Sequence, residues 1–325
     1  MLTLGCRATA PMHVWQPPEL ESAVAKRVVI AGVDGPSDIA GPLIEQLIRQ
    51  SPRDRGRELQ LSTVAQLKAA AGDDEASETI RLVSAVEDLP TGIVPSDVSL
   101  LPLARSQGYD LLLQGVVSGR RDPRHPHTRV DDKSSSDDAK SPEHLTVSWR
   151  LTDTSGRQAP LGRPINVRLD DAMQRYPDLA FIGDPKTALL AAAARDTNRL
   201  IIPFTRRDDV PLSVPYLLPG SREVRRGNAL AMAGRWKEAQ EIWQDVVDGN
   251  PIQVSALVNL ALAAAARQDF STAKKLARQA IRRAPSRLAQ ETLVWIELRQ
   301  REYHKAFGLP TPPEGWYVTR EDLPL

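Results

Sequence analysis

The order of hydrophobic and polar positions predicts a strand and then a helix near the start of the chain. Residues 26–35, KRVVIAGVDG, contain a short apolar run with β-branched side chains, bounded by Asp and Gly, as buried strands do. The residues that follow place apolar side chains at helical spacing, which predicts one helical face for packing. That face consists of Ile39, Leu43, Ile44, Leu47 and Ile48.

The alternation of predicted strands and helices continues through the first two thirds of the chain. The further elements are a strand at 58–63, a helix at 62–72, a helix, glycine turn and strand over 100–119, two strands about a turn at 153–156, a helix at 184–200 and a short closing strand at 201–204. Strands that alternate with helices are typical of α/β or α+β sheet domains. We therefore expect such a domain over residues 25–206.

The last third of the chain contains an internal repeat. The positions that recur at an offset of 34 residues are Gly227 and Ala261, Trp236 and Phe270, Ala239 and Ala273, and Pro251 and Pro285. Small residues let two antiparallel helices approach closely, and a proline ends the second helix because it lacks an N–H group. We expect an all-α repeat domain over residues 220–306, whose last helix, at 286–307, caps the array or begins a third repeat.

The repeated positions resemble the tetratricopeptide repeat (TPR), and the resemblance covers residues 220–286. It implies a protein-interaction module that binds partners along a concave face. The positions of that face are Val224, Asn228, Ala231, Met232, Val258, Leu262, Ala265 and Ala266. The chain keeps Asn228 but has valine where family members that clamp a peptide carboxylate have lysine. Two interpretations stay open: the face packs against the protein's own N-terminal domain, or it receives an external partner.

Composition narrows the range of partners. A net charge of +1 over 325 residues gives no reason to expect nucleic acid or an anionic membrane surface as the main partner. No run of about 18 apolar residues is present, so no bilayer-spanning helix is predicted. The 26 prolines concentrate at junctions and predict a linker at 207–219 and a tail at 307–325. The one cysteine, Cys6, excludes an internal disulfide and a thiolate metal cluster.

The sheet region is similar to a class of bacterial envelope lipoproteins over about residues 25–205. In the curli-secretion (CsgG-like) and penicillin-binding-protein activator (LpoB-like) types, a helix ends in Gly-x-Asp and leads into a strand that ends in Gly. The matching residues here are Gly108, Tyr109, Asp110 and Gly115, followed by a hairpin turn at 153–156. The resemblance implies a lipid-anchored protein of the cell envelope. The polar segment 120–143, predicted to be a disordered loop, argues against a pore subunit, because a membrane strand needs alternating apolar positions.

Cys6 has three interpretations: an incidental residue, a reactive thiol, or a lipid-attachment site. We expect the third, because LTLGC resembles the lipobox of bacterial lipoproteins and Gly5 occupies the small position before the cut. A secretory signal needs about 15–30 residues, so we expect that the coding sequence begins upstream of Met1. Arg7 stands where inner-membrane lipoproteins carry aspartate, which favours the outer membrane. Residues 1–24 would then be a tether.

The remaining candidate sites favour no catalysis and no cofactor. The turn GVDGPSDIAG lacks both nucleotide-binding fingerprints. His125 and His127, with Asp131 and Asp132, lie in the predicted loop, where nothing holds metal ligands in place. The chain contains no G-x-S-x-G, H-E-x-x-H or kinase motif.

We therefore expect a non-catalytic protein-binding or assembly factor of the bacterial envelope. It would be periplasmic, anchored in the outer membrane through Cys6, and would bind other envelope proteins through its repeats. Two alternatives remain: a soluble cytoplasmic TPR adaptor, and an enzyme whose α/β domain is catalytic.

Overall fold

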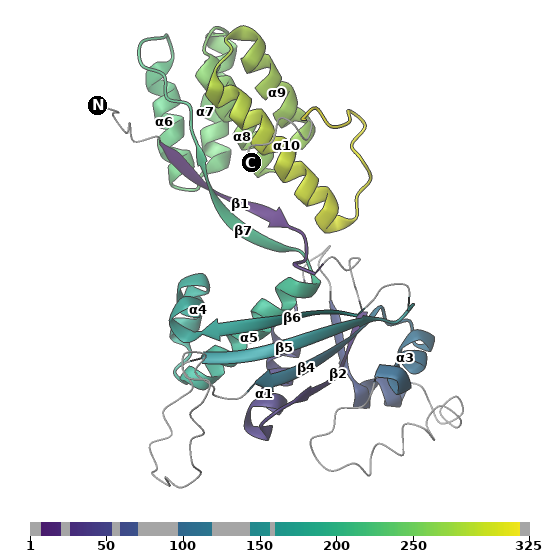
Figure 1. Ribbon diagram of the computed structural model, residues 1–325. Coiled ribbons are helices and arrows are strands. Elements are labelled where there is room, and N and C mark those ends of the chain that lie inside the picture. Colours follow the sequence, from purple (N-terminus) through teal and green to yellow (C-terminus); the bar gives the residue numbers. More distant parts are fainter. Residues whose placement is uncertain are drawn as a thin grey trace. The chain divides into compact units, whose positions relative to one another are not determined.

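The structure is a computed structural model that describes residues 8–20, 27–53, 59–70, 97–118, 144–156 and 160–318. The chain divides into two compact units. One, the sheet unit, consists of residues 18–202. The other, the helical unit, combines residues 1–17 with residues 203–325. A sheet region followed by a helical region was predicted, and this coarse order is confirmed (Figure 1).

Among its described residues, the sheet unit has five strands in the order β3-β2-β4-β5-β6. β2 is parallel to β3 and β4, whereas β4, β5 and β6 are antiparallel neighbours. The elements are β2 (Arg27–Asp34), α1 (Ser37–Arg49), β3 (Gln60–Thr63), α3 (Asp97–Ser106), β4 (Leu111–Ser118), β5 (His144–Asp153), β6 (Leu161–Arg168), α4 (Leu169–Arg175), the 3-10 helix η1 (Pro177–Phe181) and α5 (Pro185–Ile201).

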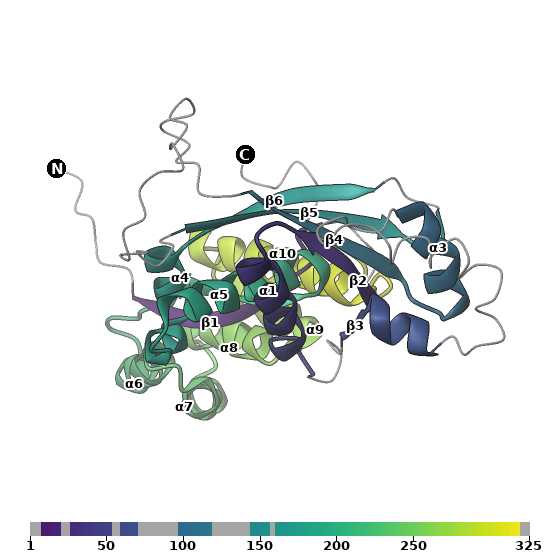
Figure 2. The same cartoon turned by 90° about the horizontal axis from the view of Figure 1, so that it is seen from below.

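Alternate side chains of the central strands pack on opposite faces of this sheet. Val28 and Leu113 join the core formed with α1 and α5, which lie on the same side of the sheet (Figure 2). Val29 and Leu112 face the other way, toward α3 and a helical segment at 64–70. This two-sided burial explains why β2 and β4 consist of almost continuous apolar residues.

The two sequence motifs that carried the envelope resemblance meet at one end of the sheet. The Thr154 hydroxyl donates hydrogen bonds to the carbonyl oxygens of Tyr109 at 2.6 Å and Asp110 at 3.1 Å. The Asp110 carboxylate accepts from the Arg27 amide at 2.9 Å, which ties the start of β4 to the start of β2. Gly108 has a φ of 71°, a conformation that favours glycine. The motifs thus have a structural role in ending α3 and starting β4.

In the part that the structure describes, the helical unit contains five helices and a two-stranded antiparallel sheet of β1 with β7. Its elements are β1 (Thr9–Gln16), β7 (Phe204–Pro211), α6 (Ser221–Met232), α7 (Trp236–Gly249), α8 (Val254–Ala266), α9 (Phe270–Arg283) and α10 (Arg287–Phe307). Neighbouring helices pack side by side in chain order. Gly227 permits the close contact of α6 with α7, because a Cβ there would lie 2.3 Å from Nε1 of the buried Trp243. The identification of these helices as TPR units stays a prediction.

The structure differs from the sequence analysis at three junctions. The predicted tether at 1–24 contains β1, and the predicted linker at 207–219 contains most of β7. The predicted closing strand at 201–204 is the end of α5 followed by a turn into β7. The local signal was weak because β7, FTRRDDVP, has one fully buried side chain, Val210, and its pairing partner lies almost two hundred residues away. Among the described residues, no helix is long and apolar enough to cross a membrane.

Candidate functional site

The face predicted to bind a partner is largely buried inside the helical unit. Of the predicted positions, Met232 is half exposed and Ala266 partly exposed. The others are buried: Val224, Asn228, Ala231, Val258, Leu262 and Ala265. This face is therefore not an open groove.

Three of the apolar positions of that face, Val224, Ala231 and Leu262, pack in one cluster with β1, whereas Val258 and Ala265 pack in other clusters of the helical unit. Ala10, Met12 and Val14 alternate along β1 and pack in one cluster with Val224 and Leu262 of the helices. These are the side chains that a strand presents on a single face. On α7, the Trp236 indole N–H donates to the carbonyl oxygen of Pro11 at 2.8 Å. A segment from the extreme N-terminal part of the chain thus occupies the place expected for a partner.

The polar part of the face holds the segment that follows β7. The Asn228 side chain donates to the Ser213 carbonyl oxygen at 3.0 Å, and the Asn259 side chain donates to the same oxygen at 3.0 Å. The Asn259 side-chain oxygen accepts from the Ser213 amide at 2.8 Å. The two asparagines also bond to each other at 2.8 Å. Together they satisfy both backbone groups of one residue, as a peptide-binding groove does for a bound peptide.

Sequence reasoning selected Asn228 but missed Asn259. A signal was present, because Asn259 is the one polar side chain in the middle of the apolar helix VSALVNLALAAAA. A buried amide in such a helix needs hydrogen-bond partners. The offset of 34 residues carries Val224 onto Val258, the neighbour of Asn259, so the repeat pattern predicts Val258 and not Asn259. The residue is fully buried.

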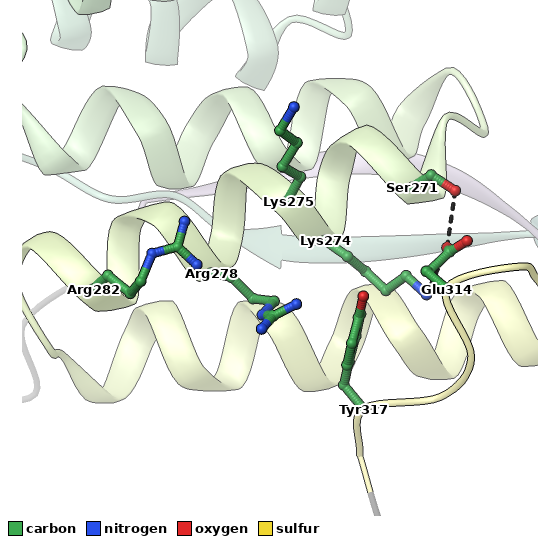
Figure 3. A pocket seen from close by; sticks show the side chains of 7 residues that line it. All are labelled: Ser271, Lys274, Lys275, Arg278, Arg282, Glu314 and Tyr317. Carbon is green, nitrogen blue, oxygen red and sulfur yellow. Dashed lines mark hydrogen bonds and ion pairs between the residues drawn. The ribbon is translucent and has the colours of Figure 1, made fainter.

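A second feature, which we call the basic pocket, lies between α9 and the segment that follows α10 (Figure 3). It is a cavity of about 240 Å³. Its lining residues are Ser271, Lys274, Lys275, Arg278 and Arg282 from α9, with Glu314 and Tyr317 from the segment. The tail predicted at 307–325 supplies one wall of this pocket. The sequence pattern does not predict the pocket, because nothing in it indicates that this tail and α9 lie together.

The back of the basic pocket is an ion pair between a buried lysine and a partly exposed glutamate. Lys274 is 1% exposed, and its ammonium lies 2.8 Å from the Glu314 carboxylate. The same ammonium donates to the Gly315 carbonyl oxygen at 3.2 Å. The hydrogen bond and charge of Lys274 lower the pKa of Glu314 from the usual 4.5 of a glutamate to about 2. A buried lysine is tolerated here because its charge is paired.

A second buried charge fixes the segment from the other side. Glu297 on α10 is fully buried, and its carboxylate accepts hydrogen bonds from the amides of Tyr317 and Val318, both at 2.8 Å. Arg301, one turn further along α10, pairs with Glu297 at 2.9 Å. The wall of the pocket formed by Tyr317 is thus held by backbone hydrogen bonds to a charged group, which are among the stronger kinds.

The outer part of the basic pocket is positively charged. Lys275, Arg278 and Arg282 form no ion pair within the part of the chain that the structure describes, and α9 itself carries no acidic residue. The Arg278 guanidinium lies 4.4 Å from the centre of the Tyr317 ring. Basic residues near the end of a helix are favoured by its dipole, but that effect explains Arg282 and not Lys275. The arrangement suits an anion with several negative groups.

Several predicted site residues lie outside the described residues. These are Cys6, and the loop 120–143 with His125, His127, Asp131 and Asp132. Among the residues that are described, no group of three His, Cys, Asp or Glu side chains is placed to hold a metal ion.

Comparison of the chain with protein-family models, with curated proteins and with solved structures found no match. The TPR and envelope-lipoprotein resemblances therefore rest on the sequence patterns described above.

We predict that Asn259→Leu destabilises the protein by about 1–3 kcal/mol, because it leaves the partly buried Ser213 amide without its acceptor. Urea unfolding measures this difference. Ser213→Ala is the matched control and should be nearly neutral, since the asparagines contact only the backbone of Ser213. Equal stability of Asn259→Leu and the wild type would show that the segment after β7 is not held on the helices.

We predict that the segment after α10 detaches from α9 in acid. The pKa of Glu314 is lowered on folding, so its contribution is complete above 4.5 and disappears as the pH falls from 4.5 toward 2. The fluorescence of Trp316, obtained as the difference between the wild type and Trp316→Phe, should change over this range. Glu314→Gln should abolish the change, whereas Glu241→Gln, at an exposed position of α7, should retain it. An unchanged acid transition in Glu314→Gln would contradict the assigned role of the ion pair.

Proposed function

We propose that this chain is a non-catalytic protein-binding factor whose basic pocket receives an acidic segment of a partner protein. The observation that carries the proposal is the row of cations on α9 that has no acidic counterpart among the described residues. Behind that row, the ion pair between Lys274 and Glu314 is already complete. The pocket is therefore built before any ligand arrives, and its outer charges remain for that ligand.

The spacing of the cations supports an extended peptide as the ligand. Lys275 and Arg282 are seven positions apart, so along a helix they are separated by about 10 Å. An extended peptide covers that distance in about three residues. A short run of Asp and Glu side chains can therefore meet Lys275, Arg278 and Arg282 in turn. The Tyr317 ring offers an apolar surface beside them.

The proposal places the interface on a different face from the one the TPR resemblance implies. The concave positions Val224 and Leu262 already pack against β1, and Asn228 already binds Ser213. A partner at that face would have to displace two segments of the chain. The basic pocket needs no displacement, so it supports protein binding more directly.

We also propose that the protein belongs to the bacterial cell envelope and is anchored through Cys6. The support is the lipobox-like LTLGC and the resemblance of residues 25–205 to envelope lipoproteins. The soluble cytoplasmic adaptor remains the alternative, and the basic pocket would serve either location.

We predict that a fluorescent oligoglutamate peptide binds the full chain, measured by anisotropy, and that Lys275→Glu or Arg278→Glu weakens this binding by about fivefold to tenfold. Each substitution replaces an attraction of roughly 1 kcal/mol with a repulsion. Lys237→Glu, an exposed position on α7, makes the same change in net charge and should have little effect. Equal weakening by Lys237→Glu would mean that net charge, and not the pocket, attracts the peptide.

The anchor has a separate test. The gene, expressed with its in-frame upstream codons in a bacterial host, should incorporate labelled palmitate in the wild type and not in Cys6→Ser. Absence of label in the wild type, or equal label in both, would remove the lipoprotein assignment without affecting the peptide-binding result.

A further inference from the structure

One end of the helical unit exposes four large apolar side chains, which we call the apolar tip. Three are consecutive in the loop that leads into α6: Tyr216 is 80% exposed, Leu217 97% and Leu218 48%. The fourth, Ile252, lies in the turn between α7 and α8 and is 64% exposed. Single exposed apolar residues are ordinary, but a contiguous group indicates an interaction surface.

The apolar tip is held in place by buried hydrogen bonds. Gln253, which is fully buried next to Ile252, donates to the carbonyl oxygen of Pro219 at 2.9 Å and so joins the two loops. The Ser221 hydroxyl donates to the Leu218 carbonyl oxygen at 2.5 Å. Gly220 has a φ of 81°, and a Cβ there would lie 2.9 Å from Val246 of α7. The exposure of the tip is thus a fixed property of the fold.

Arginines surround the apolar tip. Arg222, Arg225 and Arg226 are exposed on the first two turns of α6, and Arg225 donates to the Pro215 carbonyl oxygen at 3.1 Å beside Tyr216. From α9, Arg283 donates to the carbonyl oxygen of Pro251, the residue before Ile252. The acidic residues exposed on the first two turns of α6 and the last two turns of α7 are Glu223, Asp245 and Asp248. Positive charge therefore prevails around the tip.

We propose that the apolar tip docks on the surface of an anionic lipid bilayer. Leu217 is 97% exposed, so its whole side chain is available to enter the apolar layer of a bilayer. Tyrosine and leucine side chains are suited to the headgroup boundary, while arginines at the rim bind anionic headgroups. The arginines thus match the anionic headgroup layer of the bilayer, and the apolar side chains match the acyl-chain layer below it. This contact is additional to the proposed peptide binding and uses none of its residues.

The path of the chain is consistent with a membrane at this end. The Ala8 carbonyl oxygen accepts a hydrogen bond from the Leu212 amide at 2.8 Å. The start of β1 thus lies beside Leu212, which precedes Tyr216 by four residues. A lipid on Cys6 would add a second membrane attachment, and the docking proposed here does not require it.

The test is sedimentation of the full, unacylated chain with vesicles. Vesicles of phosphatidylcholine mixed with phosphatidylglycerol should bind the protein, and pure phosphatidylcholine vesicles should bind it much less. Leu217→Ser should lower the partition coefficient roughly tenfold. Arg222→Ala and Arg226→Ala should each lower it roughly fivefold and reduce its dependence on salt.

Phe181→Ser is the matched control, because Phe181 is 91% exposed but belongs to the sheet unit. It should bind mixed vesicles as the wild type does. Failure of the wild type to bind mixed vesicles would overturn the proposal, as would equal loss in Leu217→Ser and Phe181→Ser. If Leu217→Ser instead lost only a protein partner while vesicle binding was unaffected, the tip would be a protein interface and the proposal would be wrong. The oligoglutamate assay on the same variants shows independently that the fold and the basic pocket are intact.

Discussion

The pairing of β1 with β7 is the constraint on which the helical unit depends. Thr9 pairs with Pro211 and Gln16 with Phe204, so the N-terminal strand is held beside the chain that leads into the helices. This pairing places alternate side chains of β1 on α6 and α8 and buries them. A strand pair alone is marginal in water, and the helices supply the apolar surface that it needs. In return, the strands cover the face that isolated helix pairs would leave exposed.

This arrangement changes where the protein can meet a partner. The inner face of the helices is used internally: Val224 and Leu262 pack with β1, and two asparagines bind Ser213. We therefore propose that partners bind at two outward-facing features, the basic pocket and the apolar tip. The basic pocket and the apolar tip differ in chemistry, so one suits an acidic peptide and the other an anionic bilayer. A chain with both could hold a partner protein at a membrane surface, which agrees with the proposed location in the envelope.

Two buried charges give the basic pocket its shape. Lys274 pairs with Glu314 and donates to the Gly315 carbonyl oxygen, and Glu297 accepts from two amides of the same segment. Both charged side chains are almost completely inaccessible to water. Leaving either charge unpaired would be costly, so the segment is fixed against α9 and α10. Tyr317 is thereby held as one wall of the basic pocket. The cations beyond Lys274, which are Lys275, Arg278 and Arg282, face solvent.

The sequence alone determined the features that depend on nearby residues. Apolar spacing identified β2 and α1, and the repeat from Trp236 to Phe270 identified the helix pairs, because these signals lie within a few turns of the chain. The pairing of β1 with β7, the partner of Asn259 and the ion pair of Lys274 with Glu314 were decided by the tertiary structure. Each joins segments whose own patterns are weak: β7 has little apolar content, and a lone buried lysine resembles any surface lysine in sequence. The free energy of such contacts comes from burial and charge pairing between segments that are distant in the sequence. Local sequence patterns therefore do not indicate which segments pack together.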